Sequence, residues 1–378
     1  MDKETLNDPA EMRTAVVDSL VRQGFSVEDG QIRAPEMSSK AALRALHREA
    51  VEHQRERSKP GLRRHEEWLL GQIADGSDLL PSAICPSLVL VTPESKEELL
   101  FRWARLHWSI PTSAGYGRRL RFLVMDEAHG KLMGIIGLAD PVFGLSSRDL
   151  WVGWDAQARR ERLHQVMDAF VLGAVPPYNQ LLAGKLVAML ATCAEIQTAY
   201  RERYCGVASV ISGRDREEPL AMVTTASALG RSSVYNRLRM DDRKVAISVG
   251  FTKGSGDFQF ANGLYEDLTA YARLHCTPTA KHSKWGSGFR NRREVVKKAL
   301  RHLGLGEALL YHGVRREVFV FPMGENAAAA LTYGESLRPY AETAADMAEF
   351  WKQRWMIPRA IRREDYKSFR PENWRLWT

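Results

Sequence analysis

Hydrophobic and polar positions alternate with a changing period along the chain, and these changes predict a mixed α/β protein. Between residues 12 and 20 the apolar residues recur every three to four positions, as on one face of a helix. The segment FSVEDGQIRA (25–34) then holds two short extended runs joined by Asp29-Gly30, a favoured hairpin turn. A second helical pattern covers residues 40–57. Residues 1–90 are therefore predicted to be a helical region around one small hairpin.

The pattern changes after residue 90, where extended and helical segments alternate. RLRFLVMDEAHGKLMGIIGLAD (119–140) predicts two strands that turn at His129-Gly130. The apolar run FVLGAV (170–175) predicts a buried strand, and the segment after it predicts a turn and one long helix. Strand patterns return at LAMVTTAS (220–227) and at KVAISVGFTKG (244–254). Residues 91–280 are therefore predicted to form an α/β core.

This order of elements resembles the GNAT acyltransferase fold, so the fold class we expect is α/β (α+β) with a GNAT-like mixed sheet. The resemblance implies a loop after the buried strand that holds the pyrophosphate of coenzyme A at a helix N-terminus. In YNQLLAGKL (178–186), Gln180 is followed by Ala183 and Lys185 where the GNAT pattern has small residues, mostly glycine. The buried strand also lacks the glutamate that often acts as general base. We therefore predict no particular cofactor and assign no catalytic residue.

A hydroxyl-rich stretch, TTASALGRSSVYNRLRMDD (224–242), predicts an anion site at the start of a short helix. The unpaired N–H groups of a helix N-terminus favour a phosphate, and an arginine beside them adds charge. The alternative is ordinary N-capping by Ser232 or Ser233, with Tyr235 and Leu238 in the core. The candidate ligand-binding residues are Asn179, Gln180, Lys185, Ser232, Ser233, Tyr235, Asn236 and Arg237.

The charge of the chain favours polyanionic partners. The 378 residues carry a formal net charge of +8, and 44% of them are hydrophobic, enough for two or three domains. No apolar run is long enough to span a membrane, and the first residues are acidic and polar, so we expect no membrane contact. The four cysteines stand far apart, which predicts the cytoplasm and no metal site.

The basic residues gather in KHSKWGSGFRNRREVVKKALRH (281–302), where eight lysines and arginines face Glu294 alone. Such a cationic segment suits contact with nucleic-acid phosphates, with Trp285 and Phe289 available to stack on bases. A second, smaller cluster follows the glycines Gly115 and Gly117. Residues 281–378 are predicted to be a basic, tryptophan-containing α+β region. The candidate nucleic-acid-binding residues are Arg118, Arg119, Lys281, Lys284, Arg290, Arg292, Arg293 and Lys297.

Several blocks of the sequence together resemble the DruA family of the Druantia anti-phage defence system. They are WSIPTSAGYGRRLRFLVMD, GLADPVFGLSSRDLWVGWD, MDAFVLGAVPPYNQLLAGKLVA, TTASALGRSSVYNRL and GFRNRREVVKKALRHLGLGEALLYHGVRREVFVFP. The resemblance implies a cytoplasmic component of a bacterial multi-gene antiviral system, whose hallmark partner is a very large helicase-like protein. It implies no set of catalytic residues.

Three hypotheses for the function follow. The first is a component of a defence complex that contacts DNA or RNA, partner subunits or both. The second is a GNAT-like acyltransferase or a protein that binds a nucleotide or coenzyme. The third is a nuclease, which would need paired carboxylates around a divalent metal, and Asp149, Asp155 and Asp168 are close in sequence. Asp155, however, stands where it would cap a helix. We favour the first hypothesis and leave enzymatic activity open.

Overall fold

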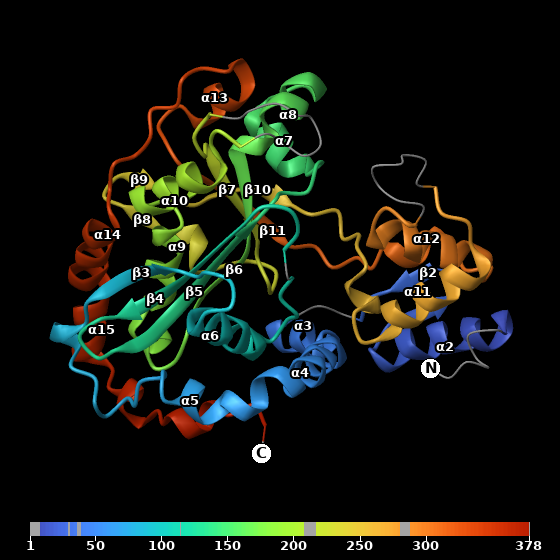
Figure 1. The fold of residues 1–378 in the computed structure, drawn as a ribbon, viewed down its shortest axis with the longest axis horizontal. Coiled ribbons are helices and arrows are strands. Elements are labelled where there is room, and N and C mark those ends of the chain that lie inside the picture. Colours follow the sequence, from blue (N-terminus) through green and yellow to red (C-terminus); the bar gives the residue numbers. More distant parts are fainter. Residues whose placement is uncertain are drawn as a thin grey trace. The chain divides into compact units, whose positions relative to one another are not determined.

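The computed structural model describes residues 8–28, 31–35, 39–113, 115–207, 217–279 and 288–377. The chain divides into two compact units, each built from segments that lie far apart in the sequence. Unit 1 combines Met1–Ser58, Trp108–Pro111 and Lys253–Arg316; unit 2 combines Lys59–His107, Thr112–Thr252 and Glu317–Thr378. Helices and a mixed sheet confirm the predicted α/β class (Figure 1). The predicted functional division at residues 90 and 280 stays a prediction.

Unit 1 is mainly helical. Its elements are α2 (Pro9–Arg22), β1 (Ser26–Glu28), β2 (Gln31–Arg33), α3 (Lys40–Leu46), α4 (Arg48–Leu62, whose last turn belongs to unit 2), α11 (Leu264–His275) and α12 (Arg292–His302). β1 and β2 pair antiparallel as predicted, although their turn at Asp29-Gly30 lies outside the described residues. The single helix expected over residues 40–57 is instead two helices, because the backbone ends α3 at His47 and α4 starts afresh.

Unit 2 is organised around a seven-stranded sheet in the order β10-β11-β7-β6-β5-β4-β3. Its strands are β3 (Pro86–Leu90), β4 (Arg119–Asp126), β5 (Lys131–Ala139), β6 (Val166–Ala174), β7 (Met222–Ala226), β10 (Ile247–Phe251) and β11 (Glu317–Pro322). Every neighbouring pair is antiparallel except β6 and β7, which are parallel. The strand pair predicted around His129-Gly130 is confirmed as β4 and β5. β8 (Arg239–Met240) and β9 (Arg243–Lys244) form a separate small hairpin.

Helices cover both faces of this sheet. They are α5 (Glu66–Leu70), α6 (Lys96–Ala104), α7 (Ser146–Val152), α8 (Ala156–Arg162), α9 (Ala183–Leu190), α10 (Ala194–Tyr204), α13 (Ala327–Tyr333), α14 (Ala344–Trp351) and α15 (Ile357–Arg362). A π-helical turn, η10 (Lys352–Met356), joins α14 to α15. Along β6, Met167 belongs to the cluster with α9 and α14, whereas Val166 belongs to the cluster with α7, α8 and α13. Adjacent residues of a strand point to opposite faces, so the sheet is buried between two helical layers.

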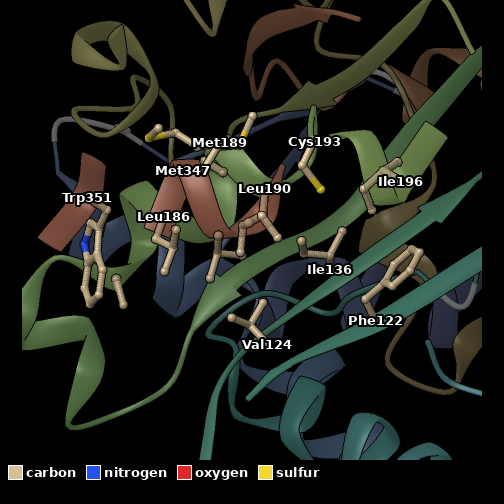
Figure 2. Close-up of a cluster of buried hydrophobic side chains, with 14 of the residues drawn as sticks. Phe122, Val124, Ile136, Leu186, Met189, Leu190, Cys193, Ile196, Met347 and Trp351 are labelled. Carbon is tan, nitrogen blue, oxygen red and sulfur yellow. The ribbon is translucent and has the colours of Figure 1, made fainter. Parts of the chain in front are cut away.

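The largest core lies where α9 and α14 meet the strands, as Figure 2 shows. Leu186 and Leu190 of α9 are buried to within 1% of complete burial, beside Ile136 of β5 and Met347 of α14. Each such side chain contributes roughly 1.5–3 kcal/mol of stability. Trp351 at the end of α14 is also fully buried, and its indole N–H donates to the carbonyl of Leu182 at 3.1 Å. This contact fixes the turn from which α9 begins.

Two helical predictions need correction. The long helix expected after the turn breaks between α9 and α10, because Cys193 is extended (φ −75°, ψ 164°) and the N–H of Ala194 donates to the carbonyl of Glu342. The segment SRDLWVGWD, expected as a strand or turn, instead forms helix α7, which ends at Gly153 in the left-handed region (φ 78°). Trp154 is buried as the sequence indicated, and Asp155 caps α8 through the N–H of Ala158 at 2.7 Å.

Candidate anion-binding sites

Helix α12 presents a cationic face on unit 1. Its N-cap is Asn291, whose side chain accepts from the N–H of Glu294 at 2.9 Å. One side of the helix is buried, and it consists of Val295, Val296, Ala299 and Leu300. The opposite side borders an open hollow of about 340 Å³, which we call the α12 hollow. Its lining residues are Thr279, Asn291, Arg293, Glu294, Lys297, Lys298, Arg301 and Glu307.

The cations of the α12 hollow differ in how far they are already engaged. Lys297 and Arg301 both bond the carboxylate of Glu307, at 2.5 and 2.7 Å, and the bond from Lys297 lowers the pKa of that carboxyl. Lys298 donates to a backbone carbonyl only. Arg293 is exposed and has no ion-pair partner among the described residues. With four cations against two carboxylates, the lining keeps a net charge of +2 at neutral pH.

Arg292, a candidate nucleic-acid contact, instead lies away from this lining. Its Nε donates to Asp257 at 2.5 Å, and its guanidinium lies 3.7 Å from the ring centroid of Tyr265. Both partners belong to unit 1, so Arg292 attaches the start of α12 to its own unit. Arg290 is exposed, and its N–H donates to Glu294 at 2.8 Å. Lys281 and Lys284 lie outside the described residues.

Arg118 and Arg119, the other candidate nucleic-acid contacts, lie in unit 2 at the start of β4. The side chain of Arg118 is 15% exposed and pairs with Asp140 at 2.6 Å. It also donates to the carbonyls of His164 and Val166 and to the hydroxyl of Tyr200. Arg119 is exposed. The engaged donors of Arg118 indicate a structural role, and nucleic-acid contact by either residue stays a prediction.

The hydroxyl-rich stretch is organised around Glu317, the first residue of β11, which sequence reasoning missed. Glu317 is 3% exposed and accepts hydrogen bonds from three sources: the backbone N–H of Ser232, the amide of Asn236 and the hydroxyl of Ser248. The hydroxyl of Ser232 caps the short helix η6 (Tyr235–Arg237) through the N–H of Tyr235. These contacts correspond to the capping alternative.

Tyr235 packs into the core. Its ring meets those of Phe319 and Phe321 edge-on, with centroids 5.2 and 5.6 Å apart, and burial raises the pKa of its hydroxyl to about 12. Ser233 and Asn179 are exposed. Gln180 accepts at its backbone carbonyl from Nε of Arg359, at 3.1 Å. The structure therefore engages several of the predicted ligand-binding residues internally, and ligand binding by this set stays a prediction.

Two of the predicted ligand-binding residues, Lys185 and Arg237, do lie together. Lys185 is in the first turn of α9, and Arg237 ends η6. Burial lowers the pKa of Lys185, and the positive charges of Arg354 and Arg237 lower it further. The ammonium of Lys185 lies 4.1 Å from the ring centroid of Trp355. Arg354 and Trp355 belong to the π-helical turn η10 and were not among the candidates, because their place beside α9 depends on tertiary packing.

The acidic candidates of the nuclease hypothesis have separate local roles. Asp149 accepts from Arg148, Arg159 and the indole of Trp154. Asp168 on β6 accepts from the hydroxyl of Thr224, and burial raises its pKa to about 6. Within the part of the chain that the structure describes, no group of three or more His, Cys, Asp or Glu side chains is arranged to hold a metal ion.

The fold and these sites define an α/β protein with two clusters of basic side chains, and comparison with known proteins shows its family. The family model for Druantia protein DruA matches residues 37–333. Druantia protein DruA from Escherichia coli (strain UMEA 4076-1) is 38% identical over 364 residues, which cover 96% of this chain and 90% of that protein. The chain therefore belongs to the DruA family.

Two further comparisons bear on earlier expectations. No solved structure matches the chain, so the likeness to the GNAT fold rests on the order of elements and stays a prediction. Over the residues that the structure describes, none of the helices has the length and apolar character needed to cross a membrane.

Proposed function

We propose that this DruA-family protein is a component of a Druantia anti-phage defence system that contacts nucleic acid through the α12 hollow. Membership of the family supports the role in defence. The observation that carries nucleic-acid contact is the alignment of Arg293, Lys297, Lys298 and Arg301 around one open hollow with a net positive lining. We further propose that it works in the cytoplasm with other subunits of the system, including the large helicase-like protein.

The physical basis is the strong attraction between clustered cations and a phosphate backbone. Each lysine or arginine that neutralises a phosphate releases a condensed counterion, so binding of this kind weakens steeply as salt is added. Arg293 can contact phosphate oxygens bidentately, because its guanidinium has no acidic partner among the described residues. Lys297 and Arg301, which already bond Glu307, serve mainly to orient the surface.

The test compares two double charge reversals in the full chain. Arg293→Glu with Lys298→Glu removes the two least engaged cations of the α12 hollow. We expect at least tenfold weaker binding of DNA or RNA, measured by fluorescence anisotropy at about 0.1 M salt. The slope of log K against log salt should fall by about 2 for duplex DNA, since each lost phosphate contact removes roughly 0.9. The same variant should lose protection in a phage plaque assay.

The matched control is Lys40→Glu with Arg44→Glu, which changes the net charge equally on exposed residues of α3 that do not line the hollow. We expect less than a threefold loss of affinity for this control. Arg292 is excluded from the test because its contacts with Asp257 and Tyr265 stabilise unit 1. Equal affinity and salt slope in the α12 variant and the wild type would refute nucleic-acid contact at the hollow.

A second candidate function, a GNAT-like transferase or a nucleotide- or coenzyme-binding protein, is favoured by the pairing of β6 and β7. Their parallel ladder covers only Val166–Asp168 and Met222–Thr224, although β6 continues to Ala174. Two strands that pair over one end and part beyond it are what the resemblance to GNAT enzymes implies for a cofactor site. Native mass spectrometry of the purified protein for bound coenzyme A or nucleotide tests this candidate.

A further inference from the structure

We propose that Lys185, Arg237 and Arg354, here called the cation cluster, bind the polyphosphate group of a small nucleotide-type ligand in unit 2. This site is separate from the α12 hollow, which belongs to unit 1. The three residues come from three elements far apart in sequence, α9, η6 and η10. Only the folded unit therefore assembles the cation cluster.

The cation cluster lacks a carboxylate that would neutralise it. Among the described residues, none of its three members has an acidic oxygen within 4.0 Å, the limit of an ion pair, in contrast to Lys297 and Arg301 of the α12 hollow. Lys185 is only partly exposed, and two guanidinium groups lie close enough to disfavour its charged form. Like charges that are held together without a counterion destabilise one another, and a bound polyanion would relieve this repulsion.

The elements that carry the three cations are fixed by other contacts. The indole of Trp351 holds the carbonyl of Leu182, just before α9, and Arg359 holds that of Gln180. Glu317 holds η6 through Ser232 and Asn236. Trp355 keeps the stem of Lys185 in place from the π-helical turn, a type of irregularity found often at functional sites. A ligand that meets such a pre-organised site has less conformational entropy to overcome.

The arrangement suits a compact polyphosphate better than a nucleic-acid strand. Three cations that surround one position match the clustered charge of a di- or triphosphate, whereas the charges of a nucleic-acid backbone are spread along a line. Arginine contributes bidentate hydrogen bonds to phosphate oxygens, and lysine contributes a point charge. The chemistry common to candidate ligands is therefore a terminal di- or triphosphate.

The experiment uses isothermal titration calorimetry on the full chain with three probes: pyrophosphate, ATP and a short single-stranded DNA. Lys185→Met removes the charge but keeps an unbranched stem against Trp355, and Arg354→Gln removes the second charge. We expect at least tenfold weaker binding of pyrophosphate and ATP in each variant, with a melting temperature equal to or above that of the wild type. Arg203→Gln, an exposed cation on α10, is the control and should bind within twofold of the wild type.

Three results would overturn the proposal. The first is that pyrophosphate and ATP do not bind the wild type at millimolar concentration. The second is that Lys185→Met and Arg354→Gln bind both as well as the wild type does. The third is that the cation-cluster variants weaken binding of the DNA alone, which would make the site a nucleic-acid contact. Arg293→Glu with Lys298→Glu should leave pyrophosphate binding unchanged, so failure at one site is distinguishable from failure at the other.

Discussion

Glu317 shows how a single buried carboxylate organises a segment that is far away in sequence. It lies at the first position of β11, where its side chain is 3% exposed. It accepts hydrogen bonds from the N–H of Ser232, from the amide of Asn236 at 3.0 Å and from the hydroxyl of Ser248 at 2.8 Å. A buried charge of this kind is tolerated because every donor points at it.

Glu317→Ala should therefore destabilise the protein strongly. The substitution leaves the donors of Ser232, Asn236 and Ser248 without their acceptor, at a cost of about 3 kcal/mol. For a unit of this size we expect a fall in melting temperature of roughly 6–12 °C in differential scanning fluorimetry. Pyrophosphate binding should also weaken, because Arg237 lies at the end of the segment that Glu317 holds. Glu325→Gln, on an exposed residue whose ion pair is loose at 3.6 Å, is the control and should melt within 1 °C of the wild type. A stable Glu317→Ala would show that the hub is dispensable.

The sequence predicts the residues of this segment better than their partners. Ser232 and Asn236 stood out because hydroxyl and amide groups at the start of a short helix suggest hydrogen bonding. Glu317 is 81 positions after Asn236, and nothing in the sequence near β11 marks it as their acceptor. Arg354 was missed for the same reason. Local chemistry can be predicted from the sequence, whereas a contact between distant segments requires the fold.

Elements that are specified by local pattern were predicted correctly. β4 and β5 alternate in polarity and join at a glycine-containing turn, so both strands and their pairing follow from residues 119–140 alone. Helix ends set by tertiary contacts were not. α9 and α10 share a continuous helical pattern, and the break at Cys193 depends on a backbone bond from Ala194 to Glu342 in a distant loop. The π-helical turn η10 likewise has no signal in the sequence.

The junction between α3 and α4 carries a pair of buried histidines that should make unit 1 sensitive to acid. His47 at this junction is fully buried, and Arg316 donates to its Nε2 at 3.2 Å, which requires a neutral imidazole. His312 is 4% exposed and accepts from the N–H of Val314. Both rings pack against Phe258. Burial, and after it the charge of Arg316, lowers the pKa of His47 to about 3 and that of His312 to about 4.

These depressed pKa values fix the sign of the pH dependence. Below about pH 6.5 the unfolded chain takes up protons at both histidines while the folded chain does not, so stability falls as the pH drops toward 4. Each histidine should contribute a loss of roughly 2 kcal/mol between pH 6 and pH 4.5. Hydrogen exchange of α11 peptides, corrected for the intrinsic effect of pH, measures this loss.

The matched variant for this test is His312→Asn, whose side-chain oxygen can still accept from Val314 but does not titrate. Carboxylates titrate equally in both proteins, so the difference in slope isolates the histidine. We expect the variant to lose about 2 kcal/mol less than the wild type over the same range. Identical slopes would mean that His312 contributes nothing to the acid sensitivity.

At the scale of the whole molecule, the chain enters unit 1 three times. The sequence suggested regions that follow one another, because composition and periodicity change along the chain and carry no information on which distant segments pack together. Residues 253–316 share a unit with residues 1–58, so the basic helix α12 depends on the N-terminal helices. The family model begins at residue 37 and leaves out α2 and the β1–β2 hairpin, although both belong to this unit.

Removal of residues 1–35 should therefore unfold unit 1 and spare unit 2. Met12, Val16 and Leu20 of α2 are completely buried, and Phe25 and Ile32 are at most 5% exposed. Five such side chains contribute roughly 10 kcal/mol, which is comparable to the whole stability of a typical domain. The deletion also breaks two polar contacts with the segment before α11, from Gln23 to the carbonyl of Gln259 and from Asn262 to the hydroxyl of Ser19.

Hydrogen exchange with mass spectrometry distinguishes the two units in this truncated chain. Peptides from α11 and α12 should lose their protection, because their unit loses part of its core, whereas peptides from β5 and α9 should keep theirs, because unit 2 contains no residue before Lys59. Nucleic-acid binding through the α12 hollow should be lost along with the fold of α12, while pyrophosphate binding at the cation cluster should persist within twofold. A truncated chain in which α12 stays protected and binds DNA as the full chain does would show that α12 folds without the N-terminal helix and hairpin.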